Sequence, residues 1–390
     1  MMLTFPEYAI KCIHKLEAMG FEAYLVGGCV RDALLGRNIS DIDITTNALP
    51  RQIIEIFDNT IPTGIKHGTV TVILEGNSVE ITTYRTEKGY NDSRHPDEVI
   101  FVSNLEQDLS RRDFTINAMA YNPAKGLIDL FGGKNDLVSK TIKTVGDPKI
   151  RFSEDALRIL RAFRFASVLD FTIEDKTRQA AMELKSGINN ISGERLLSEL
   201  IKLSCGKKPS AVLDFVNAGG LECFGIYSAL YSPAVFDSLC TFDLKNDIVP
   251  IFFSLFKCDI ELITKKLKPS NDLKNHICFL IIKADKLSIT DKTNLKLALN
   301  EHGEQNLILY ANQLKLLDSP LSDFIFHLYD EVIRNNEPFR LKDLPIDGKD
   351  IMDFGFSGTE VGAILQKLLL HVISHPKDNR RNILLEIAKN

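Results

Sequence analysis

The chain has 390 residues, of which 44% are hydrophobic and 25% are charged, and its net charge is −5. This length is too great for a single hydrophobic core, so we expect a soluble protein of two to four domains. The longest apolar stretch covers only residues 248–256 and contains a proline, which excludes a membrane span. The acidic net charge excludes a protein that coats nucleic acid non-specifically, although a local basic surface could still bind RNA.

The first part of the chain predicts a small α/β domain that ends near residue 145. Apolar periodicity predicts a helix over residues 1–19, and this pattern is not that of a signal peptide. Residues 75–77 are expected to form the turn of a β-hairpin. The polar segment 87–97 lacks aliphatic residues and is expected to be a mobile loop. Runs rich in β-branched residues predict strands at 22–27, 41–46, 69–74, 78–85, 98–102 and 126–130.

From residue 146 onward, helical patterns replace the strands. Ser153 and Ser192 are expected as helix N-caps. The seven cysteines are scattered and form no CxxC pair, so we expect reduced, buried thiols in a cytoplasmic protein and no zinc site. Helices are predicted over 153–169, 174–185, 193–204 and 208–218, with shorter helices beyond residue 220.

The most informative segment joins two glycines, a short helical stretch and a pair of aspartates. Gly27 and Gly28 let a ligand approach the backbone closely, and the N–H groups that start the following helix can meet phosphate oxygens. Arg31 lies in that helix. Asp41 and Asp43 are two residues apart on an extended run, so both carboxylates should project from one face and suit Mg2+. Each feature alone is common, but together they predict a nucleoside triphosphate site.

A second motif runs from Arg111 to Ala120. Arg112 and Asp113 are expected to start a helix whose apolar residues pack inward. An arginine at a helix start is unfavourable for the helix dipole, so Arg112 requires an anionic partner. A triphosphate would serve, and so would Asp113 or Glu106.

The third motif places Asp155, Arg158, Arg161 and Arg164 at successive spacings of three. This spacing is expected to keep them on one flank of a helix. A helix held by ordinary salt bridges is one interpretation. However, residues 151–164 contain four arginines and only two acids, which favours an anionic ligand.

One aspartate and one arginine could together read a nucleobase. Cytosine and adenine both offer an amino donor beside a ring-nitrogen acceptor, whereas uracil and guanine present a carbonyl and an N–H at those places. If Asp155 accepts from the amine and Arg158 donates to the ring nitrogen, the site accepts C and A. It rejects U and G, because those bases would leave buried polar groups unpaired.

On these motifs the chain resembles the class II tRNA nucleotidyltransferases, the bacterial CCA-adding enzymes of the polymerase-β-type superfamily. The resemblance extends to residues 62–70, 80–85 and 344–350 together with Gly355. It implies an α+β fold in which a small mixed α/β nucleotidyltransferase head with a β-sheet precedes an elongated, all-helical remainder that holds tRNA. The implied parts are a head at 1–145, a neck at 146–206, a body at 207–330 and a tail at 331–390.

The resemblance also implies roles for individual residues. Asp41 and Asp43 are expected to be catalytic and to hold the Mg2+ ions that activate the tRNA 3′-hydroxyl. The loop 87–97 resembles the flexible loop of members that add the final A. Contacts with ATP or CTP are assigned to Gly28, Arg31, Arg112, Asp155, Arg158, Arg161 and Arg164. Further candidates near the site are Gly27, Glu80, Arg94 and Glu154.

The expected activity is template-independent addition of C, C and A to the 3′ end of tRNA from CTP and ATP, with release of pyrophosphate. No membrane and no obligate protein partner is expected. The alternatives within the same chemistry are a poly(A) polymerase and an enzyme that adds only A. A non-catalytic RNA-binding protein is a further alternative. A small-molecule nucleotidyltransferase shares the glycine and aspartate motifs but would not need so long a helical extension.

Overall fold

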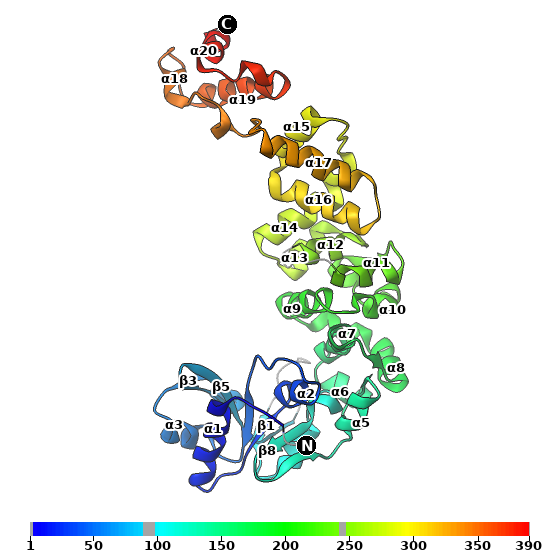
Figure 1. Ribbon diagram of the computed structural model, residues 1–390. Helices are drawn as coiled ribbons and strands as arrows, with labels where there is room; N and C mark the ends of the chain where they lie inside the picture. The colour runs from blue at the N-terminus through cyan, green and yellow to red at the C-terminus, as the bar shows by residue number, and fades with distance from the viewer. Residues whose placement is uncertain (1–2, 89–97, 242–246, 390) are drawn as a thin grey trace. The chain divides into compact units, whose positions relative to one another are not determined.

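The computed structural model describes residues 3–88, 98–241 and 247–389, which divide into two compact units. The first unit comprises the chain up to residue 229 and residues 261–268, and the second comprises residues 230–260 and 269 onward (Figure 1). The predicted α+β class is confirmed, because a mixed sheet lies near the N-terminus and helices make up most of the rest. The finer division into head, neck, body and tail stays a prediction.

A seven-stranded mixed sheet organises the N-terminal part of the first unit, in the order β3-β4-β5-β2-β1-β8-β9. β2 and β5 run parallel, and the other neighbours are antiparallel. The predicted hairpin is confirmed, with Glu75 and Gly76 at its turn, both with positive φ. The strands are β1 (Ala23–Val26), β2 (Asp43–Thr46), β3 (Thr60–Gly64), β4 (Thr69–Leu74), β5 (Asn77–Thr83), β8 (Met119–Asn122) and β9 (Gly126–Asp129).

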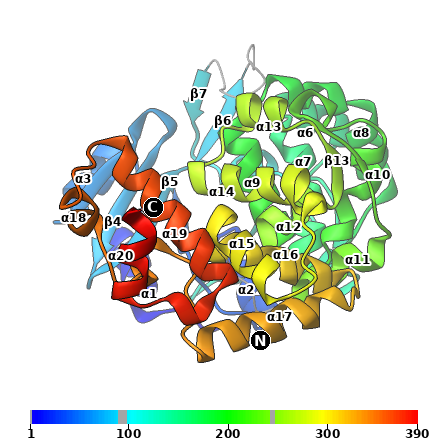
Figure 2. The same cartoon turned by 90° about the horizontal axis from the view of Figure 1, so that it is seen from above.

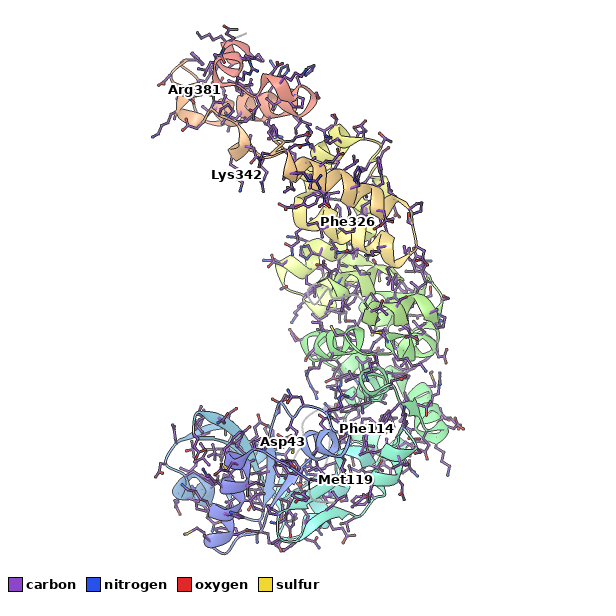
Figure 3. All side chains as sticks on the ribbon, viewed as in Figure 1. Asp43, Phe114, Met119, Phe326, Lys342 and Arg381 are labelled. Atoms are coloured by element: carbon purple, nitrogen blue, oxygen red, sulfur yellow. The ribbon has the colours of Figure 1, made fainter. Side chains whose placement is uncertain are left out.

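The helix predicted to start at Arg112 is wrong. Helix α4 (Leu105–Ser110) ends before this residue, and strand β8 pairs with both β1 and β9. An apolar run of this length fits a helix or a strand, and here the ladder with two neighbouring strands decides. The predicted inward side chains are nevertheless fully buried: Phe114, Ile116, Ala118 and Met119. Figure 3 labels Phe114 and Met119.

The long helix predicted over 153–169 is interrupted at Asp155. Helix α6 (Pro148–Glu154) is capped by Asp147, whose side chain accepts a hydrogen bond from the Lys149 amide, so the predicted cap at Ser153 is also wrong. Helix α7 (Leu157–Leu169) follows. The Asp155 carboxylate accepts a hydrogen bond from the first amide of α7, that of Leu157, at 3.0 Å, which explains why the helix is interrupted there.

Several of the remaining helices of the first unit contact strands of the sheet. The prediction for residues 193–204 is confirmed as α9, which packs against α7 (Figure 2). Two short strand pairs join β6 (Arg85–Lys88) to β7 (Glu98–Phe101) and β10 (Thr141–Ile142) to β11 (Thr172–Ile173). The helices are α1 (Glu7–Ala18), α2 (Gly28–Leu34), α3 (Pro50–Ile56), α5 (Gly133–Val138), α8 (Asp175–Glu183), α9 (Gly193–Ser204), α10 (Leu213–Asn217) and α13 (Ile260–Leu267).

In the residues that the structure describes, the second unit is helical apart from the short strand β13 (Phe256–Cys258). Its C-terminal part has its own apolar core, in which Leu368, Val372 and Leu384 are fully buried. Within the described residues, no helix combines the length and apolarity that crossing a membrane requires. The helices are α11 (Pro233–Ser238), α12 (Ile248–Ser254), α14 (Asn271–Cys278), α15 (Lys292–His302), α16 (Glu304–Leu316), α17 (Leu321–Arg334), α18 (Gly348–Met352), α19 (Thr359–Ser374) and α20 (Arg381–Lys389).

All seven cysteines are free thiols, as predicted. Cys12 and Cys29 are buried, but Cys205 and Cys240 are exposed, so the predicted burial holds for only some of them.

Candidate active site

The two predicted catalytic aspartates lie at the start of strand β2, as Figure 3 shows for Asp43. Asp43 is the first residue of the strand, and Asp41 precedes it and is exposed. Both side chains line one cavity, whereas Ile42 and Ile44 are buried. The alternation expected of an extended run therefore places both carboxylates at the same site, even though the regular strand begins only at Asp43.

We call this space the first cavity; its volume is about 330 Å³. It brings together eight of the predicted site residues with three that the sequence did not single out as ligands. Its lining consists of Gly27, Gly28, Arg31, Asp41, Asp43, Arg112, Asp113, Asn117, Arg161, Arg164 and Phe165.

Gly27 is required here by both its backbone and its surroundings. It precedes α2 with a φ of 73° and a ψ of −132°, a conformation that side chains with a Cβ rarely adopt. A Cβ at this position would lie 3.2 Å from Nη1 of Arg112 and 3.7 Å from Oδ2 of Asp43. The glycine therefore lets the arginine and the aspartate approach each other across the cavity.

Arg112 has an anionic partner that the sequence reasoning missed. Its Nη2 lies 3.3 Å from Oδ2 of Asp108, and Arg111 contacts the other oxygen of the same carboxylate at 2.7 Å. Burial alone would raise the pKa of Asp108, but the two arginines outweigh it and lower that pKa. Because Arg112 follows the C-terminal end of α4, its charge is favourable for the helix dipole, opposite to the predicted situation. Nε of Arg112 is buried and has no acceptor among the described residues.

The other arginines of the first cavity gather around one aromatic ring. The guanidinium of Arg164 lies 3.8 Å from the centre of the Phe165 ring, and those of Arg31 and Arg161 lie 5.2 and 5.4 Å away. Arg31 also donates to Asn117 at 2.7 Å. Phe165 is not among the predicted site residues, because its position in the apolar pattern of α7 is that of a core residue.

Two buried acids neutralise part of this positive charge. Asp113 accepts from Nε and Nη2 of Arg161 at 2.9 and 2.6 Å, and Glu199 on α9 lies 2.6 Å from Nε of Arg164. Burial, with a contribution from neighbouring Arg161, lowers the pKa of Arg164 to about 10, so it stays charged at neutral pH. Residues 151–164 do contain more arginines than acids, but Asp113 and Glu199, which lie outside this motif, supply carboxylates that pair with Arg161 and Arg164.

The carboxylates of the first cavity have a suitable environment for a divalent cation. Burial raises the pKa of Asp43 to about 6; Arg112 opposes this effect, and Glu80 and Asp41 add to it. A cation between Asp41 and Asp43 would relieve this unfavourable burial of negative charge. Among the described residues, no group of three or more His, Cys, Asp or Glu side chains forms a preassembled metal site.

A second cavity of about 260 Å³ adjoins the first and shares Arg112, Asp113 and Arg161 with it. Arg158 is buried and forms an ion pair with Glu154, and its Nη2 donates to the carbonyl of Arg111 at 3.0 Å. The residues that line the second cavity are Arg111, Arg112, Asp113, Asp155, Leu157, Arg158, Arg161 and Arg195.

Two of the predicted site residues that the structure describes do not line either cavity. Glu80 on β5 is exposed and pairs in register with Asp43 on the neighbouring strand. Glu154 acts through Arg158, with which it pairs. Arg94 and most of the predicted loop lie outside the described residues.

The two cavities together can hold an anionic nucleotide. The first cavity offers arginines for phosphates beside two carboxylates for a cation. The second offers a carboxylate and a guanidinium whose hydrogen-bonding pattern suits the edge of cytosine or adenine. Because three residues belong to both cavities, one bound nucleotide could occupy both.

Comparison with known proteins identifies the family of the chain. The family described as "Poly A polymerase head domain" matches residues 23–143, and "Probable RNA and SrmB- binding site of polymerase A" matches residues 170–215. A CCA-adding enzyme of Lactobacillus delbrueckii subsp. bulgaricus is 41% identical, over 97% of this chain and 96% of its own length.

Two solved structures extend the comparison to the fold. The Bacillus stearothermophilus CCA-adding enzyme in complex with CTP has a TM-score of 0.80 at 28% identity, covering 99% of this chain and 97% of that one. A CCA-adding enzyme in complex with ATP has a TM-score of 0.68 at 25% identity, covering 94% of this chain and 89% of that one. The resemblance drawn from the motifs is thus confirmed, and the chain belongs to the family of CCA-adding enzymes, the tRNA nucleotidyltransferases whose head domain is shared with poly(A) polymerases.

Proposed function

We propose that the two adjoining cavities form one active site that adds C, C and A to the 3′ end of tRNA from CTP and ATP. The observation that carries this proposal is the set of residues common to both cavities, Arg112, Asp113 and Arg161. They connect the cavity that holds the two carboxylates to the cavity that holds the two base-reading side chains. A cytoplasmic location, which the sequence predicts, suits an enzyme that acts on tRNA.

In the first cavity the chain's residues hold the triphosphate and orient its α-phosphorus. Arg31, Arg112 and Arg164 present positive charge, and the buried Nε of Arg112 is a donor that a phosphate oxygen would satisfy. Asp41 and Asp43 would hold Mg2+, which supplies Lewis-acid activation of the tRNA 3′-hydroxyl when bound. The hydroxyl oxygen then bonds to the α-phosphorus, pyrophosphate leaves, and the hydroxyl proton is lost to solvent.

In the second cavity Asp155 and Arg158 replace a template strand. Asp155 accepts from the exocyclic amine of C or A, and Arg158 donates to the adjacent ring nitrogen. The buried position of Arg158, held by Glu154 and two backbone carbonyls, keeps its donors in a fixed direction. Uracil or guanine would set a carbonyl against the Asp155 carboxylate, and this mismatch would exclude them.

Three tRNA transcripts test the activity: one that ends before CCA, one that ends at C and one that ends at CC. With CTP and ATP together, each should be extended to CCA and no further. With ATP alone, only the transcript that ends at CC should gain one residue. Extension of that transcript alone under all conditions would identify an A-only enzyme, and unlimited addition of A would identify a poly(A) polymerase.

The catalytic roles require a separate test. Asp41→Ala and Asp43→Ala should each lower the rate of addition by roughly a thousandfold or more, because the cation could no longer be held beside the triphosphate. Asp58→Ala, which removes an exposed acid of the same domain, is the matched control and should retain full activity. Retention of activity in both cavity variants would contradict the assignment and favour a site elsewhere.

A further inference from the structure

Helix α9 lies against α7, and two of its charged side chains pair with residues that line the two cavities. Arg195 and Glu199 are four residues apart and therefore occupy one face of this helix. Arg195 pairs with Asp155, and Glu199 pairs with Arg164. Asp155 and Arg164, which are expected to contact the base and the phosphates, thus each have a partner on α9.

Arg195 contacts the base-reading carboxylate directly. Its Nη2 donates to Oδ2 of Asp155 at 2.9 Å, while Oδ1 of Asp155 accepts from the amide of Leu157 at 3.0 Å. Each oxygen therefore has one fixed donor, and the plane of the carboxylate is set from both sides. A carboxylate oxygen can accept more than one hydrogen bond, so both oxygens can still meet an exocyclic amine.

The second terminal nitrogen of Arg195 has a different environment. Nη1 is buried and has no acceptor among the described residues, although Arg195 lines the second cavity together with Asp155 and Arg158. An unpaired buried donor is costly unless a ligand or water satisfies it. This position therefore has one donor available to an acceptor of the incoming nucleotide.

We propose that Arg195 is a positioning residue that determines nucleotide specificity by fixing the Asp155 carboxylate against the base. The proposal rests on the assignment of Asp155 as a base-reading residue. When Arg195 is absent, the carboxylate can turn about its side-chain bonds and move its oxygens away from a carbonyl of uracil or guanine. The repulsion that excludes these bases then falls, while the correct bases lose alignment.

The test compares selectivity in three variants. Arg195→Met removes the guanidinium and keeps most of the apolar stem, and Arg195→Lys keeps the charge but not the planar fork. Lys202→Met, at an exposed position of the same helix, is the matched control. The ratio of kcat/KM for CTP to that for UTP is measured on tRNA that lacks CCA, and the ratio for ATP to GTP on tRNA that ends at CC.

We expect Arg195→Met to lower both ratios by at least tenfold, Arg195→Lys to restore part of the loss, and Lys202→Met to match the wild type. A purely structural role would lower kcat/KM for all four nucleotides equally and leave the ratios unchanged. That result would overturn the proposal. If Arg195→Met does not fold, the ratios of Arg195→Lys decide, and wild-type ratios in that variant would also overturn it.

Asp155→Ala separates this inference from the assignment on which it rests. If Asp155→Ala relaxes selectivity and the Arg195 variants do not, only the role of Arg195 is wrong. If Asp155→Ala keeps the wild-type ratios, the base is read elsewhere and both proposals are wrong.

Discussion

Asp113 joins the two cavities, and its replacement by asparagine gives a quantitative test of how the site is held together. Burial alone would raise the pKa of Asp113, but Arg161 and a hydrogen bond from Asn117 outweigh it and hold the pKa at about 2. Compared with an ordinary value of 3.8, this corresponds to roughly 2 kcal/mol of stability at neutral pH, since one pKa unit is about 1.4 kcal/mol. Asp113→Asn should therefore lower the free energy of unfolding by at least about that amount, because the buried Arg161 also loses its paired charge.

The pH dependence identifies the cause of this loss. The pKa of Asp113 is lower in the folded protein than in the unfolded chain, so its stabilising effect is complete above about pH 4 and disappears as the pH falls towards 2. Urea denaturation of wild type and Asp113→Asn should show a constant difference between pH 5 and pH 8. This difference should shrink as the pH falls below 4.

An exposed ion pair supplies the control. Asp214 pairs with Arg178, but the two side chains are 66% and 42% exposed, so Asp214→Asn should cost less than about 1 kcal/mol. An Asp113→Asn protein no less stable than Asp214→Asn would refute the reasoning. So would a stability difference from wild type that persists undiminished at pH 2.

Three further variants test other parts of the first cavity. In the protein stripped of divalent cations, Asp43→Asn should raise the melting temperature at pH 8 but not at pH 4. The reason is that burial raises the pKa of Asp43 to about 6, so its ionised form destabilises the fold above that pH. An equal gain in melting temperature at both pH values would contradict this. Gly27→Ala should weaken binding of a fluorescent CTP analogue at least tenfold, because its Cβ would meet Arg112. Gly132→Ala, where φ is also positive but no atom lies within 4 Å, should cost only about 1 kcal/mol of stability and leave CTP affinity unchanged. Phe165→Leu should raise KM for CTP several-fold without changing the order in which C and A are added. The reason is that the guanidiniums of Arg31, Arg161 and Arg164 would lose the aromatic ring beside them. An unchanged KM would show that the ring is only a core residue.

The parts of the fold that the sequence predicted well depend on local periodicity. Asp41 and Asp43 share a cavity because alternate residues of an extended run face the same side, and α9 follows the helical spacing of its apolar residues. Strand β8 is not predicted because so short a run, with three apolar residues and an asparagine, fits either a helix or a strand, and only its two neighbouring strands decide. The interruption of the helix at Asp155 depends on one hydrogen bond from the Leu157 amide to the Asp155 carboxylate, which helical periodicity does not reveal.

The charged partners in the site could not be predicted, because they are distant in sequence. Asp113 and Arg161 are 48 residues apart, and Glu199 reaches Arg164 from another helix. Asp108 is the exception: it precedes Arg111 and Arg112 by three and four residues, a spacing that places their side chains together at the end of one helix. That spacing was present in the sequence and could have identified Arg112's partner.

The arginine-rich motif shows why a charge count alone is a weak indicator of an anionic ligand. All four of its arginines have a carboxylate within ion-pair distance, two of them through the single acid Glu154. A protein with clustered guanidiniums needs such pairing to remain folded while no nucleotide is bound, because buried like charges repel one another. The better indicator is the set of buried donors that the pairing leaves over, Nε of Arg112 and Nη1 of Arg195. Each lies in a residue that lines the cavities, so the ligand is expected where the protein's own acids do not reach.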